Sequence, residues 1–358
     1  MNYKNIIKLG IYLIASLILT LYGIYTYKLM NNNTVKEILI PNKEINTIPD
    51  NNIKTIKITA VGDCTIGWDS RYSYEGRYDY YLKQNNNDYG YYLSKVKDIF
   101  TNDDLTIINL EGDLTNSTEK REKKFNFSAP PEYIKVLTEA NVDIVSFANN
   151  HTHDFGEQGY QETIDTLNSI NMPYYGYTKY LIKEVNGIKI GFFGLLDIYG
   201  ERYNEVDKAI KYLKEQNCDL IIASMHWGIE YDYEQSKEQI KMGHYLIDNG
   251  VDLVIGHHPH VLQGIEKYNN KYIIYSLGNF TFGGNQNPSD KDTLIYQQTF
   301  SFKNDKLELD DNINLIPASI SSVKNINNYQ PILLESNEKQ RVLEKIMKYS
   351  SGFTYQNI

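Results

Sequence analysis

The chain opens with one long apolar segment and continues with short β-branched runs that alternate with amphipathic ones. Residues 9–27 (LGIYLIASLILTLYGIYTY) contain no charged side chain. About 20 apolar residues cross a bilayer as a helix, so this segment predicts a transmembrane helix. A cleaved signal peptide is the alternative. Signal peptides have shorter apolar regions and end in a small-x-small site, whereas this segment runs into Tyr25, Thr26, Tyr27 and Lys28.

The charges around this segment predict its orientation. Lys4 and Lys8 precede it and Lys28 follows it, so the positive-inside rule keeps the N-terminus in the cytoplasm. Residues 30–53 show no sustained period and contain two prolines, which is typical of a polar tether. We therefore expect a single-pass protein of the cell membrane. Residues 1–29 would form its tail and anchor, 30–53 its tether, and the folded part would face outward.

Beyond the tether, short β-branched runs alternate with longer amphipathic runs, which predicts a layered α/β protein. Strands are expected over 56–63, 105–112, 142–150, 219–228 and 251–260, and helices around 131–141, 158–170, 204–217 and 236–249. Turn pairs predict hairpins at Asn186-Gly187, Asn269-Asn270 and Asn304-Asp305. A last helix is expected over about 338–349. We expect one large domain over 54–302, with the hairpin and helix of 303–358 packed on it.

Composition removes several classes of protein. The 358 residues are 41 % hydrophobic and 23 % charged, which excludes collagenous, disulfide-scaffold and wholly disordered chains. The net charge of −9 argues against nucleic acid as a partner, because such binding needs clustered Lys and Arg. An anionic substrate would need a local cation. Cys64 and Cys218 provide no disulfide framework, although one bridge between them stays open.

Polar residues stand where the predicted strands end. Each of the five apolar runs stops at a residue that can bind a metal: Asp63, Glu111, Asn150, His226, and the pair His258 and His260. In open α/β sheets, ligands gather beyond the carboxyl ends of the strands. Carboxylate, amide and imidazole groups together suit Mn²⁺, Fe or Zn²⁺ better than Ca²⁺ or Cu(I). The pattern therefore predicts a divalent metal site.

Each of these residues also has a structural interpretation. A single histidine at a strand end is more often structural, and Asp63 after Gly62 fits a turn. Glu111 directly after LTIINL is costly to bury unless a cation pairs with it. His244 lies within a helical run and is expected to have no chemical role.

The segment after residue 148 offers two interpretations of its own. Asn150, His151 and Asp154 fit an Asx turn that starts the next helix. In the chemical interpretation, which we favour, Asn150 binds metal and His151 protonates a leaving group. Asp154 would then hold the other ring nitrogen of His151.

Six motifs, in order, now support a resemblance. They are AVGD (60–63), NLEG (109–112), FANNHTHDFG (147–156), MHWGIEYD (225–232), GHHPHVLQ (256–263) and YSLGNFTF (275–282). Over roughly residues 55–300, the chain resembles the CapA family of bacterial poly-γ-glutamate capsule-synthesis proteins. That family is similar to the calcineurin-like metallophosphoesterases. The resemblance implies a four-layer αββα sandwich with a metal site at one edge.

The wider superfamily pattern implies a role for each residue. Glu111 would bridge two ions, one also held by Asp63 and His260, the other by Asn150, His226 and His258. His151 would be the general acid. The first motif departs from the usual Asp-x-His, since Cys64 and Thr65 follow Asp63. That site would be weak, mononuclear, or completed by water, His153 or His257. Cys64 as a soft ligand is the remaining option, although a thiol there is more often buried packing.

The expected function is therefore a membrane-anchored, metal-dependent hydrolase of poly-γ-glutamate capsule or envelope polymer synthesis or export. One alternative is a noncatalytic membrane subunit that binds the polymer or partners of a synthesis complex. Another is a metallophosphodiesterase acting on a different envelope substrate. Each of these candidate functions that uses a metal requires the carboxyl oxygens of Glu111 to lie within ~10 Å of the rings of His226 and His258, since coordination bonds are ~2 Å long.

Overall fold

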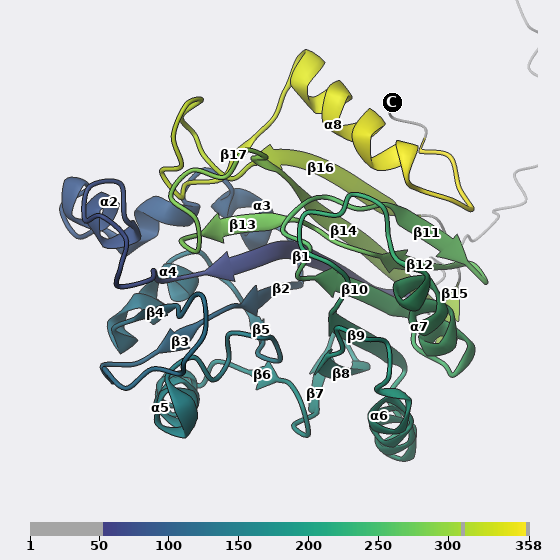
Figure 1. Ribbon diagram of the computed structural model, residues 1–358. Helices are drawn as coiled ribbons and strands as arrows, with labels where there is room; N and C mark the ends of the chain where they lie inside the picture. Colours follow the sequence, from purple (N-terminus) through teal and green to yellow (C-terminus); the bar gives the residue numbers. More distant parts are fainter. Residues whose placement is uncertain (1–52, 309–311, 356–358) are drawn as a thin grey trace, which may run out of the picture. The chain divides into compact units, whose positions relative to one another are not determined.

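The computed structural model describes residues 53–308 and 312–355 (Figure 1). The expected anchor at 9–27, and the expected tether except for Ile53, lie outside these residues and remain predictions. Within the described ranges, no helix combines the length and the apolar character needed to cross a membrane.

The larger sheet is built around β1 (Ile53–Thr65), a strand that is buried along most of its length. Its main order is β17-β16-β14-β1-β2-β5-β6. On one side of β1, the strands β2 (Leu105–Leu110), β5 (Ile144–Ser146) and β6 (Tyr174–Tyr175) follow in parallel. On the other side, β14 (Asp292–Lys303), β16 (Ile313–Ser319) and β17 (Ile332–Leu333) run antiparallel to their neighbours. In addition, β13 (Asn279–Phe282) pairs with the end of β1, and β15 (Lys306–Glu308) pairs with β14.

The second sheet has the order β11-β12-β10-β9-β8-β7. Its parallel centre consists of β8 (Ile188–Leu196), β9 (Leu220–His226), β10 (Leu253–His257) and β12 (Lys271–Ile274). The strands β7 (Leu181–Val185) and β11 (Ile265–Tyr268) close it with antiparallel hairpins. A separate two-stranded sheet joins β3 (Asp113–Leu114) to β4 (Ser128–Ala129).

Helices cover the outer faces of the two large sheets. Near the larger sheet are α2 (Tyr78–Gln84), η1 (Tyr89–Leu93), α3 (Lys97–Thr101), η2 (Pro131–Ile134), α4 (Lys135–Thr138) and α5 (Gly156–Ser169). The second sheet is covered by α6 (Tyr203–Glu215) and α7 (Lys237–Asp248), and α8 (Ser336–Lys348) packs near β16 (Figure 1).

Three hydrophobic clusters establish the order of the layers. One cluster joins Ile58 and Ile107 of the larger sheet to Phe192 and Ile222 of the second, so the two sheets face each other. The second cluster lies between the larger sheet and its helices. In the third, the second sheet packs against apolar residues of α6 and α7. The described chain is therefore a mixed α/β sandwich, as the sequence predicts.

Most of the strands, helices and turns expected from the sequence are present in the structure. All five expected strands and all four expected helical regions are present, with shifted ends. The three hairpins turn at the expected pairs, and both residues of each pair have a positive φ. The short helices between residues 78 and 101 and the long strand β16 were not expected. Cys64 and Cys218 are both free and pack in different clusters, so the disulfide left open by the sequence does not form.

Candidate metal centre

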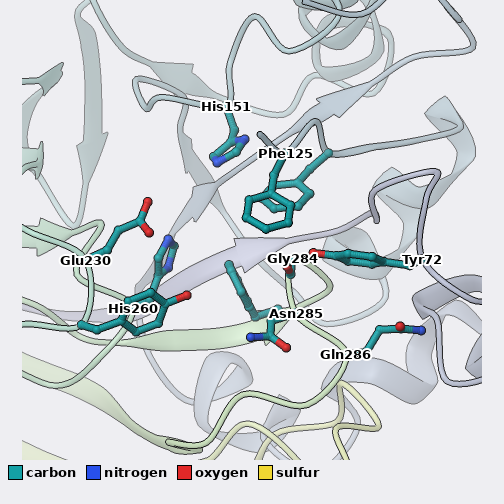
Figure 2. A pocket seen from close by; sticks show the side chains of 11 residues that line it. Tyr72, Phe125, His151, Glu230, His260, Gly284, Asn285 and Gln286 are labelled. Atoms are coloured by element: carbon teal, nitrogen blue, oxygen red, sulfur yellow. Dashed lines mark hydrogen bonds between the residues drawn. The ribbon is translucent and has the colours of Figure 1, made fainter. Parts of the chain in front are cut away.

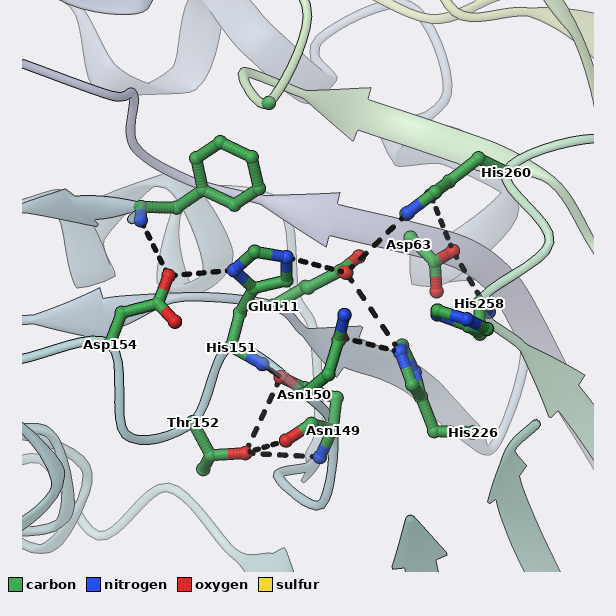
Figure 3. A network of polar contacts seen from close by, with 12 residues as sticks. Asp63, Glu111, Asn149, Asn150, His151, Thr152, Asp154, His226, His258 and His260 are labelled. Carbon is green, nitrogen blue, oxygen red and sulfur yellow. Dashed lines mark hydrogen bonds and ion pairs between the residues drawn. The ribbon is translucent and has the colours of Figure 1, made fainter. Parts of the chain in front are cut away.

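The two sheets bring the predicted ligands to one edge of the sandwich. Asp63 lies near the end of β1, Glu111 directly follows β2, and Asn150 follows β5. From the second sheet, His226 ends β9, while His258 and His260 follow β10. Figure 3 shows all six side chains around one point, together with His151. This convergence follows from parallel pairing, because the carboxyl ends of parallel strands meet at the same edge.

Glu111 lies at the centre of this cluster. Its side chain has no solvent exposure, and neither carboxylate oxygen has a hydrogen-bond partner among the described residues. Its Oε1 lies 3.7 Å from His260 Nε2 and 3.9 Å from both His226 Nε2 and His151 Nε2 (Figure 3). These separations are too long for hydrogen bonds but can be spanned by an ion with coordination bonds of ~2 Å.

The pKa of Glu111 also indicates that its carboxylate needs a positively charged partner. Burial raises the pKa of this carboxyl well above its ordinary value, and the neighbouring Asp63 adds to the rise. A buried carboxylate without a hydrogen bond is costly, and a cation is the partner that removes the cost. The residues around Glu111 therefore fit a divalent metal ion.

Asp63 is also fully buried, but it is well supplied with donors. Asn109 Nδ2 donates to its Oδ1 at 2.9 Å, and the backbone N–H of His258 donates to Oδ2 at 3.2 Å. The imidazoles of His257 and His260 lie 3.2 Å from Oδ1 and Oδ2, respectively. Although burial acts to raise the pKa of Asp63, the two histidines lower it well below its usual range. Asp63 is therefore held as a carboxylate, the form that binds metal.

The histidines from the second sheet are held in their neutral form. His226 Nε2 lies 2.9 Å from Asn150 Oδ1, and the rings of His226 and His258 are 4.8 Å apart at their centroids. Burial lowers the pKa of His226 well below its ordinary value and that of His258 to about 3. Neutral imidazole is the metal-binding form. His226 lies well within the separation from Glu111 that the metal hypothesis requires, and the His258 ring packs directly against that of His226.

His260 differs from its neighbours because it lies between two carboxylates. Burial alone would lower its pKa, but Glu111 and Asp63 raise it to about 9. Its Nδ1 is 2.9 Å from Asn279 Oδ1. Metal binding releases protons from ligands, so a cation beside Glu111 would compete with a proton on His260.

The loop after β10 has an unusual backbone. His258 and His260 adopt φ values of +97° and +57°, a region that side chains other than glycine seldom occupy. Strain of this kind persists only where surrounding contacts enforce it. The backbone turn directs both imidazoles into the cluster, as Figure 3 shows.

A second network holds His151 beside the ligands. Its Nδ1 lies 2.6 Å from Asp154 Oδ2, which also accepts the backbone N–H of Phe127 at 2.7 Å. Lys123 Nζ donates to Asp154 Oδ1 at 2.6 Å and to the carbonyl of Asn150 at 2.9 Å. With Nδ1 facing Asp154, Nε2 faces Glu111. Burial lowers the pKa of His151, against the opposing effect of Asp154.

A pocket of about 290 Å³ opens over His151 and His260 (Figure 2). Its walls are largely aromatic, formed by Tyr72, Phe125, Phe127, Tyr231 and Phe282, with Glu230, Asn285 and Gln286 at its polar side. The Phe127 ring packs 4.3 Å from His151, measured between centroids. A substrate in this pocket would reach both the metal centre and His151.

The other candidates lie apart from the cluster. The ring of His153 stacks on Tyr160 at 4.4 Å and faces Glu157, so it does not complete the site. Cys64 packs in a hydrophobic cluster, where burial raises the pKa of its thiol, which makes it a poor ligand. His244 stacks on Tyr268 and pairs with Glu266, outside the cluster.

Sequence reasoning missed several residues of the site. Asn109, Glu230 and Asn279 lie inside the quoted motifs, but nothing in their spacing assigned them a contact. His257 was weighed only as a completing ligand, yet it pairs with Asp63. Lys123 belongs to the charged run EKREKK (119–124), which is typical of a solvated loop. Only the folded chain shows that one of these lysines points inward.

The chain is similar to proteins of one family. The model described as "Bacterial capsule synthesis protein PGA_cap" matches residues 57–284. The capsule biosynthesis protein CapA of Bacillus anthracis is 29% identical over 257 residues, which cover 63% of this chain and 60% of that protein. The PGA biosynthesis protein CapA of Bacillus subtilis (strain 168) is 31% identical over 210 residues, which cover 52% and 55%.

A further relative is a probable polyglutamine synthesis accessory protein of Mycobacterium tuberculosis, 27% identical over 230 residues. These residues cover 54% of this chain and 60% of that protein. The matched region thus spans between about half and two-thirds of the length of each of these curated relatives.

Proposed function

Because the chain belongs to the family of bacterial capsule synthesis proteins, PGA_cap, we propose that it acts in poly-γ-glutamate capsule synthesis or export through a metal-dependent hydrolase site. The names of the Bacillus relatives support the capsule role. The observation that carries the hydrolase site is the fully buried Glu111 carboxylate, which has no hydrogen bond and lies within 4 Å of three imidazole nitrogens.

In this proposal the donor set would hold two ions, and Glu111 would contribute to both. Asp63 and His260 would hold one ion, while Asn150, His226 and His258 would hold the other. Bound divalent metals supply Lewis acidity and make a bound water acidic enough to become a nucleophile near neutral pH. Mn, Fe and Zn all suit this mixture of oxygen and nitrogen ligands.

The chain's own groups supply the proton transfer. His151 lies at the pocket floor with Nε2 toward the cluster, so it can donate a proton to a leaving group above Glu111. A second ring proton would be stabilised by Asp154, 2.6 Å from Nδ1. Lys123 fixes Asp154 from the other side and so holds the imidazole in one orientation.

The ligand assignment is tested by comparing two buried or half-buried histidines of the same chain. We expect His226→Ala to remove most bound metal, because its Nε2 is one of the nitrogens around Glu111. His244→Ala should leave the metal content unchanged, because that ring pairs with Glu266 outside the cluster. Elemental analysis of the purified variants measures the difference. Equal metal content in the two variants would contradict the assignment.

We further propose that residues 9–27 anchor the protein in the cell membrane with the folded part outside. Full-length protein should sediment with membranes and resist extraction by high salt or carbonate, whereas a variant lacking residues 1–29 should not. Protease added to intact protoplasts should degrade the folded part of the full-length protein. Protection of the folded part, or its release by salt alone, would reject the proposed anchor and orientation.

A noncatalytic role in a synthesis complex is the second candidate, and one observation favours it. The mycobacterial relative is named as an accessory protein of polymer synthesis. In this case the cluster would hold metal for structure, and the aromatic pocket would bind polymer without cleaving it. Hydrolysis of p-nitrophenyl phosphate or of poly-γ-glutamate by metal-loaded protein, lost in a His151 variant, separates the two candidates.

A further inference from the structure

Glu230 lies beside the cluster on the pocket side and adds a third carboxylate to Asp63 and Glu111. One carboxylate oxygen of Glu230 and one ring nitrogen each of His258 and His260 lie within 4.8 Å of one another. Glu230 is exposed and lines the pocket, while the two histidines are buried. Figure 2 shows Glu230 beside His260 at the pocket wall. This arrangement differs from the ligand set implied by the resemblance, which includes no residue between His226 and His258.

A buried and unpartnered nitrogen lies in the same group. His258 Nδ1 has no hydrogen-bond partner among the described residues, although only 6% of the residue is exposed. An imidazole nitrogen buried in this way usually has a partner. A bound cation would supply a partner for this nitrogen.

The backbone ties these residues to one another. Glu230 belongs to the loop after β9, and the N–H of the next residue, Tyr231, donates to the carbonyl of Pro259 at 2.8 Å. Pro259 lies between the two histidines whose φ values are positive. The loop that carries Glu230 is therefore docked on the strained turn that carries His258 and His260, which keeps the three side chains together.

Charge balance favours a third carboxylate. Two divalent ions carry four positive charges, and the buried carboxylates Asp63 and Glu111 supply only two negative ones. Buried charges need compensation, and Glu230 is the carboxylate that faces the remaining open side. Its exposure lets the side chain adjust to an incoming ion without disturbing the core.

We propose that Glu230 is an additional metal ligand on the pocket side of the site, beside His258 and His260. The inference rests on the proposed metal site and names a ligand outside the implied set. In this position Glu230 lines the aromatic pocket beside His260. An anionic substrate in the pocket would compete with the Glu230 carboxylate for the bound metal.

The test measures metal binding rather than activity. Full-length chain in detergent is titrated with Mn²⁺ and with Zn²⁺ by calorimetry, and the bound metal is counted after dialysis. We expect Glu230→Gln to raise the Kd of the weaker-bound ion about 10–100-fold, the range seen when the surroundings of a metal site are disturbed, or to lower the metal count by one. Glu234→Gln, a nearby exposed acid on the same loop, is the matched control and should match the unmodified protein.

The outcomes separate the two proposals. If the unmodified chain binds metal and Glu230→Gln binds it equally well, Glu230 is not a ligand, and the proposed hydrolase site stands. If the unmodified chain binds neither ion, the metal site itself is rejected and the inference falls with it. Thermal unfolding of metal-free Glu230→Gln should match that of the control, because the side chain is exposed.

Discussion

Replacing Glu111 by glutamine is expected to abolish metal binding and to stabilise the metal-free protein. The unmodified chain should gain about 2.7 kcal/mol of stability at a metal concentration of 100 times Kd, which corresponds to a rise in Tm of roughly 4 °C for a protein of this size. Glu111→Gln should show no such rise, because the neutral amide is a much weaker ligand than the carboxylate, whose Oε1 lies within 4 Å of the predicted ligands His226 and His260. Differential scanning calorimetry with and without Mn²⁺ measures both effects.

The expected higher stability of metal-free Glu111→Gln follows from the burial of the Glu111 carboxyl. Because the pKa of Glu111 is raised in the folded protein, its folded state holds the proton more tightly than its unfolded state. The stability from this group is complete below the ordinary carboxyl pKa of 4.5 and is lost as pH rises. At pH 7 in chelator, Glu111→Gln should therefore unfold at a higher temperature than the unmodified chain.

An exposed glutamate gives the control for this experiment. Glu119→Gln removes the same charge from an exposed loop and should change neither the metal-induced rise nor the metal-free Tm. A Glu111→Gln protein that still gains the full stabilisation from Mn²⁺ would show that the ion binds elsewhere.

Replacing His151 by alanine is expected to lower hydrolysis without removing metal. His151 is placed as the proton donor, and general acid catalysis contributes about 10²- to 10⁴-fold in rate. We therefore expect kcat for p-nitrophenyl phosphate to fall by about that factor, while elemental analysis shows unchanged metal content. A proton donor should affect the rate and leave the metal content unchanged, whereas loss of a metal ligand should lower both.

His153 is the matched control, because it lies two positions away and stacks on Tyr160 outside the cluster. His153→Ala should retain both the rate and the metal. Loss of metal in His151→Ala would reassign His151 as a ligand. An unchanged rate with intact metal would reject its catalytic role and favour the noncatalytic candidate.

The strand-end residues could be recognised from the sequence for a physical reason. Asp63, Glu111 and His226 each follow an apolar run, and parallel strands bring such ends to a common edge whatever the details of packing. The hairpin at Asn186-Gly187 was equally predictable, because its two positive φ values are a local property of those residues.

Residues whose role depends on a long-range contact were not predictable in this way. Lys123 lies in a run of charges, and its contact with Asp154 spans 31 residues of loop and strand. Likewise, Asn109 reaches Asp63 across 46 residues, through the pairing of β1 with β2. No periodicity encodes which charged side chain of a loop turns inward, since this depends on the surface against which the loop packs.

The sequence by itself determined the α/β class, the turns and the set of polar groups at the strand ends, because these depend on side-chain period and on local backbone preference. Only the tertiary structure decided that Glu111 is left without a hydrogen bond, that His257 pairs with Asp63, and that Glu230 faces His258 and His260. These features depend on how two separate sheets pack against each other. That packing sets distances of a few ångströms between residues that are far apart in the chain.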